Sequence, residues 1–144
     1  MESIANPLEN VDQGMMNKME KDFSEETKQK IQQARDLCKQ NKLEDAIENV
    51  LLPLEKLTRL AADMPSTSLI LEAIVELCFE GQRWTYLNDN MTLLAKKRSL
   101  IKASISKMIK KAFTYVEKTP TLETKIALIE CLRDITDGKI YRRG

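Results

Sequence analysis

The sequence predicts an all-α fold in which amphipathic helices pair into hairpins and stack side by side as a solenoid. A unit of two amphipathic helices recurs between Asn41 and Thr136 at a spacing of about 40 residues, opening at Asn41, Gly81 and Pro120. Only four glycines and four prolines interrupt the 144 residues, which is typical of long helices with short connections. No segment of useful length alternates apolar and polar residues, so no strand is predicted.

The first helix is expected to follow an N-terminal tail. Residues 1–21 mix Asn, Asp, Gly and Met, and we expect them to form a mobile tail. Ser24, followed by two glutamates, predicts a capped helix start, and the helix should run to about Gln40. We therefore predict a helical-repeat domain over residues 22–141, followed by a short tail of residues 142–144.

The next two helices are predicted on either side of a proline-containing turn. Apolar residues at three- and four-residue steps from Leu43 through Leu57 to Ala61 predict a long second helix, which Pro53 should kink near residues 49–52. Ser66 is predicted to cap a third helix over residues 67–80. Apolar residues, among them Leu69, cover most of the circumference of this helix. The helix should therefore be buried on more than one side.

Three further helices complete the prediction. Gly81 should end the third helix in a left-handed conformation. A fourth helix is expected over residues 83–96, with Trp84 packing into the groove of the preceding hairpin. The fifth, residues 99–117, and the sixth, residues 122–136, should bury stripes that contain Ile101, Ile105, Met108, Ile109, Ala112, Phe113 and Val116, and Ile126, Ile129, Leu132 and Ile135.

Composition argues against catalysis. The chain has no histidine, so the commonest general base near neutral pH is missing, and its glycines stand alone rather than forming a phosphate loop. Cys38, Cys78 and Cys131 are dispersed in apolar helical surroundings and are expected to be buried free thiols in a reducing compartment. No catalytic residue, cofactor, metal or small-molecule substrate is predicted. A net charge of +1 and the lack of a long apolar run favour neither nucleic acid nor membrane as a partner.

Two charged surfaces are the candidate partner contacts. Glu72, Glu76 and Glu80 form one stripe on the third helix, which is read first as a solvated face and second as an acidic edge facing a partner. A basic patch on the fifth helix lies opposite its apolar stripe and is interpreted in order as a solvated face, a surface for an acidic protein, or a nucleic-acid surface. Its members are Lys102, Lys107, Lys110 and Lys111.

Specific stretches of the chain resemble one known family. They include the run from Leu87 to Ser99 and the closing Gly138-Lys139-Ile140-Tyr141, within a likeness that covers about Met19 to Tyr141. These stretches resemble the amino-terminal region of the family of non-ATPase regulatory subunit 12 of the 26S proteasome, a PCI-family subunit of the regulatory-particle lid.

The resemblance implies a right-handed α-solenoid of tetratricopeptide-like hairpins, with about six helices here. In the family a PCI module follows, and we expect it to be absent from this chain because the sequence stops at Gly144. The implied role is a non-catalytic scaffold in ubiquitin-dependent degradation, in the cytoplasm and nucleus. Other lid subunits are the implied partners, with the core particle as a further one. Two alternatives stay open: a PCI-type scaffold of the COP9 signalosome or a translation-initiation complex, and a nucleic-acid-binding helical repeat.

Overall fold

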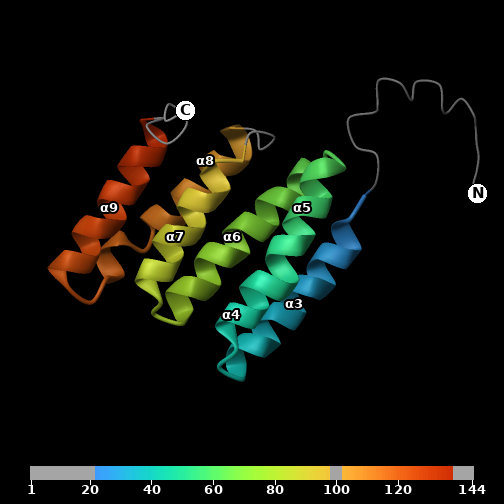
Figure 1. The fold of residues 1–144 in the computed structure, drawn as a ribbon, viewed down its shortest axis with the longest axis horizontal. Helices are drawn as coiled ribbons and strands as arrows, with labels where there is room; N and C mark the ends of the chain where they lie inside the picture. Colours follow the sequence, from blue (N-terminus) through green and yellow to red (C-terminus); the bar gives the residue numbers. More distant parts are fainter. Residues whose placement is uncertain (1–21, 98–101, 138–144) are drawn as a thin grey trace, which may run out of the picture.

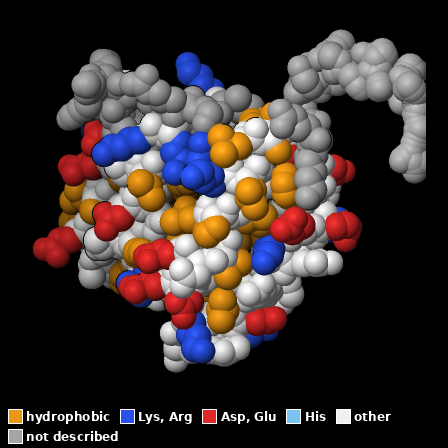
Figure 2. Space-filling model, turned by 45° about the vertical axis from the view of Figure 1, so that its right-hand side comes forward, with side chains coloured by type: hydrophobic (Ala, Val, Ile, Leu, Met, Phe, Trp, Pro, Cys, Tyr) orange, Lys and Arg blue, Asp and Glu red, His pale blue; other side chains and the backbone are white. Residues whose placement is uncertain are grey.

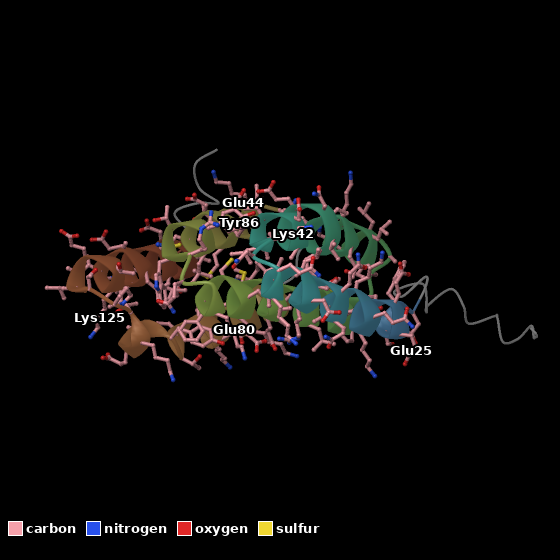
Figure 3. All side chains as sticks on the ribbon, turned by 90° about the horizontal axis from the view of Figure 1, so that it is seen from below. Glu25, Lys42, Glu44, Glu80, Tyr86 and Lys125 are labelled. Carbon is pink, nitrogen blue, oxygen red and sulfur yellow. The ribbon has the colours of Figure 1, made fainter. Side chains whose placement is uncertain are left out.

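The computed structural model describes residues 22–97 and 102–137, and within these ranges the chain is all-α, as predicted. The helices form two layers, seen edge-on in Figure 3 and face-on in Figure 1. One layer contains α3 (Ser24–Lys39), α6 (Met64–Glu80) and α8 (Lys102–Phe113). The other contains a rod formed by α4 (Leu43–Asp45), η1 (Ala46–Leu51) and α5 (Leu52–Leu60), then α7 (Trp84–Ala95) and α9 (Leu122–Thr136), with a short 3-10 turn η2 (Val116–Lys118) before α9.

Side-chain contacts between neighbouring helices of one layer recur at nearly the repeat spacing. Arg35 of α3 pairs with Glu76 of α6, 41 residues on, and Ser68 of α6 bonds to a serine 36 residues on in α8. In the other layer Thr92 of α7 contacts Cys131 of α9, 39 residues on. Helices of one layer therefore run parallel in a regular register, as a stack of hairpins requires. The right-handed sense of the stack stays a prediction.

Helix α6 is the inner helix of the stack. It packs against α3, α5, α7 and α8, and ten of its 17 residues are buried, including Ile70, Ile74 and Cys78 at no exposure. A helix surrounded on several sides needs an apolar circumference, so the prediction of burial on more than one side is confirmed. Leu69 is an exception, since it is 46% exposed on the same outer strip as the three glutamates.

Three successive turns share one left-handed geometry. The residue with positive φ is Asn41 after α3, Ala62 after α5 and Gln82 after α6. The prediction that Gly81 is left-handed is wrong, because Gly81 has φ −82°. Glycine instead allows a close approach to Leu43, since a Cβ atom added at Gly81 would lie only 3.3 Å from the Leu43 side chain. Each turn closes with the hydrogen bond of a Schellman motif, donated by the backbone N–H of Lys42 to Leu37, of Asp63 to Thr58 and of Arg83 to Cys78.

The two predicted serine caps are wrong. Ser24 is the first residue of α3 rather than its cap, and both its N–H and its hydroxyl donate to the Asp22 carboxylate. Helix α6 begins three residues earlier than predicted, because the Asp63 carboxylate accepts the Ser66 N–H at 3.2 Å. Asp63 also accepts the Phe23 N–H at 2.8 Å, so one carboxylate joins the starts of α3 and α6.

The long second helix is interrupted where Pro53 predicted a kink. Residues Ala46–Leu51 form a π-helical segment, and the Leu52 N–H reaches back to the Ile47 carbonyl. Proline has no N–H to donate to the carbonyl four residues earlier. Just before Pro53 the backbone hydrogen bonds therefore change from the α-helical to the π-helical spacing. The rod continues as α5, with Leu54 and Thr58 buried.

The fifth helix is shorter than predicted. Its expected start at Ser99 and the neighbouring Ile101 lie outside the described residues, and α8 ends at Phe113 rather than at residue 117. Phe113 is 54% exposed, which corrects its assignment to the buried stripe, and Tyr115 is buried instead. Ile126 of the predicted sixth-helix stripe is also exposed, at 46%. Ile105, Met108, Ala112 and Val116 are buried as predicted.

Candidate interaction surface

The predicted acidic stripe lies along the outer surface of α6, between α3 and α8. Glu76 is not a free charge, because its carboxylate pairs with the Arg35 guanidinium of α3 at 3.2 Å. Glu72 is half-buried and Glu80 is exposed. One of the three glutamates therefore joins two helices of the layer, and Glu80 offers the most accessible acidic group of the stripe.

The predicted basic patch divides into two parts. Lys102, Lys107 and Lys110 are exposed along the outer side of α8 and make no ion pair within the described residues. Lys111 is half-buried, and its Nζ lies 6.0 Å from the centre of the Tyr115 ring. The first three lysines are thus available to a partner, whereas Lys111 contributes to packing at the end of α8.

An aromatic cluster that the sequence did not predict joins α6 to the end of α8. The rings of Phe79 and Tyr115 stack at 3.9 Å with an angle of 7° between planes. Trp84 meets Phe79 edge-on at 5.6 Å, so its predicted packing against the preceding hairpin is confirmed. Burial raises the pKa of the Tyr115 hydroxyl above its ordinary value. The cluster fixes the position of the lysine-bearing helix relative to α6.

The second layer is joined by polar contacts between the rod and α7. The Arg83 guanidinium donates to the Glu44 carboxylate at 2.7 Å, and the Tyr86 hydroxyl donates to Glu48 at 2.7 Å. Figure 3 shows Tyr86 and Glu44 on this layer, away from Glu80. Burial and then the bond to Glu48 raise the pKa of the Tyr86 hydroxyl. These contacts restrain the two successive hairpins of the stack.

An open groove of about 820 Å³ lies between the α3–α4 turn and the α6–α7 turn. Its floor includes Leu43 and Leu77, and its charged rim is mixed. The rim cations are Arg35, Lys39, Lys42 and Arg83, and the rim anions are Glu44, Asp45 and Glu80. Arg35 and Arg83 already hold carboxylates, so the groove shows no strong preference for a ligand of either sign.

Comparison with known proteins identifies the family. Residues 45–142 match the family model described as PSMD12/CSN4, N-terminal. The chain belongs to this family. It is 39% identical over 124 residues to the 26S proteasome non-ATPase regulatory subunit 12 of Dictyostelium discoideum, covering 86% of this chain and 28% of that protein. It is 36% identical over 126 residues to the 26S proteasome regulatory subunit RPN5 of Saccharomyces cerevisiae, with the same two coverages.

A plant member of the PSMD12/CSN4 family gives the same result over a shorter stretch. The 26S proteasome non-ATPase regulatory subunit 12 homolog A of Arabidopsis thaliana is 39% identical over 100 residues, which cover 69% of this chain and 22% of that protein. The chain therefore spans about a quarter of the length of these relatives. The stripe on α6 and the lysines of α8 lie inside the matched region, whereas Arg35 precedes it.

The cysteines of this family member lack the surroundings of a nucleophile. Burial raises the pKa of the Cys78 thiol to about 12 and also raises those of Cys38 and Cys131. Thiolate formation near neutral pH is thereby disfavoured. Cys78 is buried as predicted, whereas the other two are half-buried. Across residues 22–97 and 102–137 no cluster of three or more metal-ligating side chains occurs, and no helix there is long and apolar enough to span a membrane.

Proposed function

We propose that this chain is a non-catalytic scaffold segment of the proteasome regulatory-particle lid. In this proposal it contributes protein–protein contacts to ubiquitin-dependent degradation in the cytoplasm and nucleus. Its partners are other lid subunits, with the core particle as a further candidate. Membership of the PSMD12/CSN4 family and the proteasome names of the relatives support this reading. A stack of packed helices presents a pre-organised surface, which reduces the entropy lost on docking.

The exposed lysines of α8 are the observation that carries the proposed contact. Lys102, Lys107 and Lys110 project from a helix that is fixed by the aromatic cluster and by the buried Ser68–Ser104 hydrogen bond of 2.8 Å. An acidic partner surface would gain attraction without displacing an internal ion pair. The glutamate stripe is a weaker candidate, because Glu76 already pairs with Arg35.

Charge reversal in a complete lid subunit that carries this segment tests the contact. Lys107→Glu with Lys110→Glu should weaken assembly with neighbouring lid subunits by at least about tenfold, because like charges then face each other. Native gels of reconstituted lid, with sedimentation as a second readout, measure incorporation. The matched control reverses two exposed lysines elsewhere, Lys28 and Lys118. Equal incorporation of both double variants would refute the role of the α8 lysines.

Recovered partners separate the scaffold readings. The family description joins PSMD12 with CSN4, so purification of the tagged complex with mass spectrometry should show whether lid, signalosome or initiation-factor subunits accompany the chain. The nucleic-acid reading has one favourable observation, the exposed Phe113 beside Lys110, but single-strand binding normally needs several stacking aromatics. A fluorescence-anisotropy titration at low salt should detect no binding, and salt-sensitive binding would favour that reading instead.

A further inference from the structure

Helix α9 carries an apolar stripe that the described part of the chain leaves largely uncovered. Leu122, Ile126 and Ile129 are spaced i, i+4 and i+7, so they lie on one side of the helix. Leu122 is 69% exposed, Ile126 is 46% exposed and Ile129 is half-buried. A different side of α9 is buried, and the helix contacts α7 and the η2 turn at the end of its layer (Figure 1). Helix α9 is therefore apolar on two sides, and one of them lacks a neighbour.

Charges of opposite sign lie at the two ends of this stripe. Glu123 is in the first turn of α9 and Arg133 is in its last turn. Both side chains are exposed, and neither makes an ion pair within the described residues. Lys125, on the other flank of the stripe, is already paired with Glu117 at 3.1 Å, and Glu130 is exposed one turn before Arg133. The first turn of α9 is therefore acidic and its last turn offers an accessible cation.

An antiparallel pair of α9 helices from two copies of the chain matches this arrangement. With a two-fold axis midway between Ile126 and Ile129, Ile126 of each copy faces Ile129 of the other. Glu123 of each copy then lies within one residue of the level of Arg133 in the other, so the same ion pair forms twice. We propose that this chain forms a two-fold homodimer in which the α9 helices pack antiparallel through Leu122, Ile126 and Ile129.

A second exposed apolar stripe, on α5, lacks this self-complementary charge. Pro53, Leu57 and Leu60 lie on one side of α5, with Leu57 at 51% and Leu60 at 60% exposure. Figure 2 shows hydrophobic side chains gathered on the side of the molecule that α5 occupies. Lys56 is exposed beside this stripe and makes no ion pair within the described residues. In an antiparallel pair of α5 helices the two Lys56 side chains would meet, and their like charges would oppose pairing.

The size of the α9 contact sets a modest affinity. Helix α9 has 15 residues, so it is about 22 Å long at roughly 1.5 Å per residue. One pair of helices of this length gives an interface at the low end of the usual range, below about 1,200 Å² in total. We therefore expect a dissociation constant of about 10–100 µM. The dimer should form where the chain is concentrated and dissociate on dilution.

This pairing has a consequence for the lysines of α8. A two-fold axis that runs across the two layers keeps the layer of α3, α6 and α8 of both copies on the same side. The exposed lysines of both α8 helices would then face one way, and an acidic partner would meet two lysine surfaces. The predicted tails, residues 1–21 and 142–144, lie outside the described residues, and the contact involves neither. The dimer does not depend on the proposed role in the proteasome lid.

Analytical ultracentrifugation of the complete chain tests the dimer. Between about 5 and about 500 µM, a range that brackets the expected dissociation constant, the average mass should rise from that of one chain toward that of two. Leu122→Glu with Ile126→Glu should raise the dissociation constant at least about tenfold, and both sites are exposed, so the fold should survive. The matched control, Leu57→Glu with Leu60→Glu, changes two exposed residues of α5 and should leave it unchanged. Circular dichroism confirms folding of each variant.

Exchanging the charges at the ends of α9 tests the antiparallel register. Arg133→Glu should weaken the dimer at least about fivefold, because the new carboxylate then faces Glu123 of the other copy. An equimolar mixture of Arg133→Glu with Glu123→Arg should associate more tightly than either variant alone. In the mixed dimer each contact again joins opposite charges, which a dimer held by unspecific apolar contact would not require.

Three outcomes would contradict the proposal. The first is the mass of a single chain at every concentration, which would show that the α9 stripe does not bind a second copy. The second is association that the α9 substitutions leave unchanged, or that the α5 substitutions weaken equally, which would place the contact elsewhere. The third is a mixture of the two charge variants that associates no more tightly than either alone, which would rule out the antiparallel pairing.

Discussion

Replacing Ile74 with alanine tests whether α6 is the inner helix of a stack. Ile74 has no exposed surface and lies in a helix that packs against four others. The substitution removes three carbon atoms, which at ~0.8 kcal/mol each amounts to about 2.4 kcal/mol of transfer free energy. The surrounding helices hold the site open, so a residual cavity should raise the loss of unfolding free energy to about 3–5 kcal/mol.

Urea unfolding followed by the fluorescence of Trp84, the single tryptophan, measures this loss. Leu69→Ala is the matched control on the same helix, because Leu69 is 46% exposed and should lose less than about 1 kcal/mol. The slope of unfolding free energy against urea should be unchanged in both variants. If Ile74→Ala cost no more than Leu69→Ala, helix α6 would lie at the surface and the stacked architecture would be refuted.

Three further perturbations test individual groups. Burial raises the pKa of the Cys78 thiol to about 12 from 9.0, so alkylation near neutral pH should spare Cys78 until the chain is denatured, as peptide mass spectrometry would show. The raised pKa stabilises the folded state below pH 9.0, and this stabilisation should be lost as the pH rises from 9.0 toward 12. Over that pH range the free energy of unfolding of the wild-type chain should therefore fall more steeply than that of Cys78→Ala. Asp63→Ala should cost about 1–3 kcal/mol in urea unfolding and speed hydrogen exchange of the Phe23 amide, because a cap and a buried acceptor are lost together. A double-mutant cycle of Arg35→Ala and Glu76→Ala should give a coupling of about 0.2–1 kcal/mol in the same assay, since both side chains are partly exposed.

Helix positions were predictable because burial imposes a period that the sequence displays. The stripe of α6 and the irregularity before Pro53 follow from local pattern alone. Caps were less predictable, because several polar residues near each helix start can accept an N–H. Asp63 caps α6 while also binding the Phe23 N–H from α3, and that second contact depends on how two helices meet. Extrapolating the fifth helix past Phe113 likewise assigned the wrong aromatic residue to the core.

The candidate site shows the same limit. The sequence places three glutamates on one side of α6 and four lysines on α8, but it does not give the register between helices. Register decides that Glu76 meets Arg35, 41 residues earlier, and that the Phe79 ring stacks on Tyr115, 36 positions later in the chain. The signal was present as the repeat spacing, since residues about 40 apart become neighbours in such a stack.

Register also decides which charges remain for a partner. Contacts between adjacent hairpins occupy Arg35, Glu76, Arg83 and Glu44, so these groups mainly stabilise the stack. The lysines on the outer side of α8 have no ion-pair partner among the described residues. On α5, the residues Pro53, Leu57 and Leu60 form an exposed apolar stripe. The two surfaces differ in chemistry and lie on different layers. A partner attracted by the α8 lysines should therefore bind with an affinity that falls as salt rises, whereas contacts on the α5 stripe should depend little on salt.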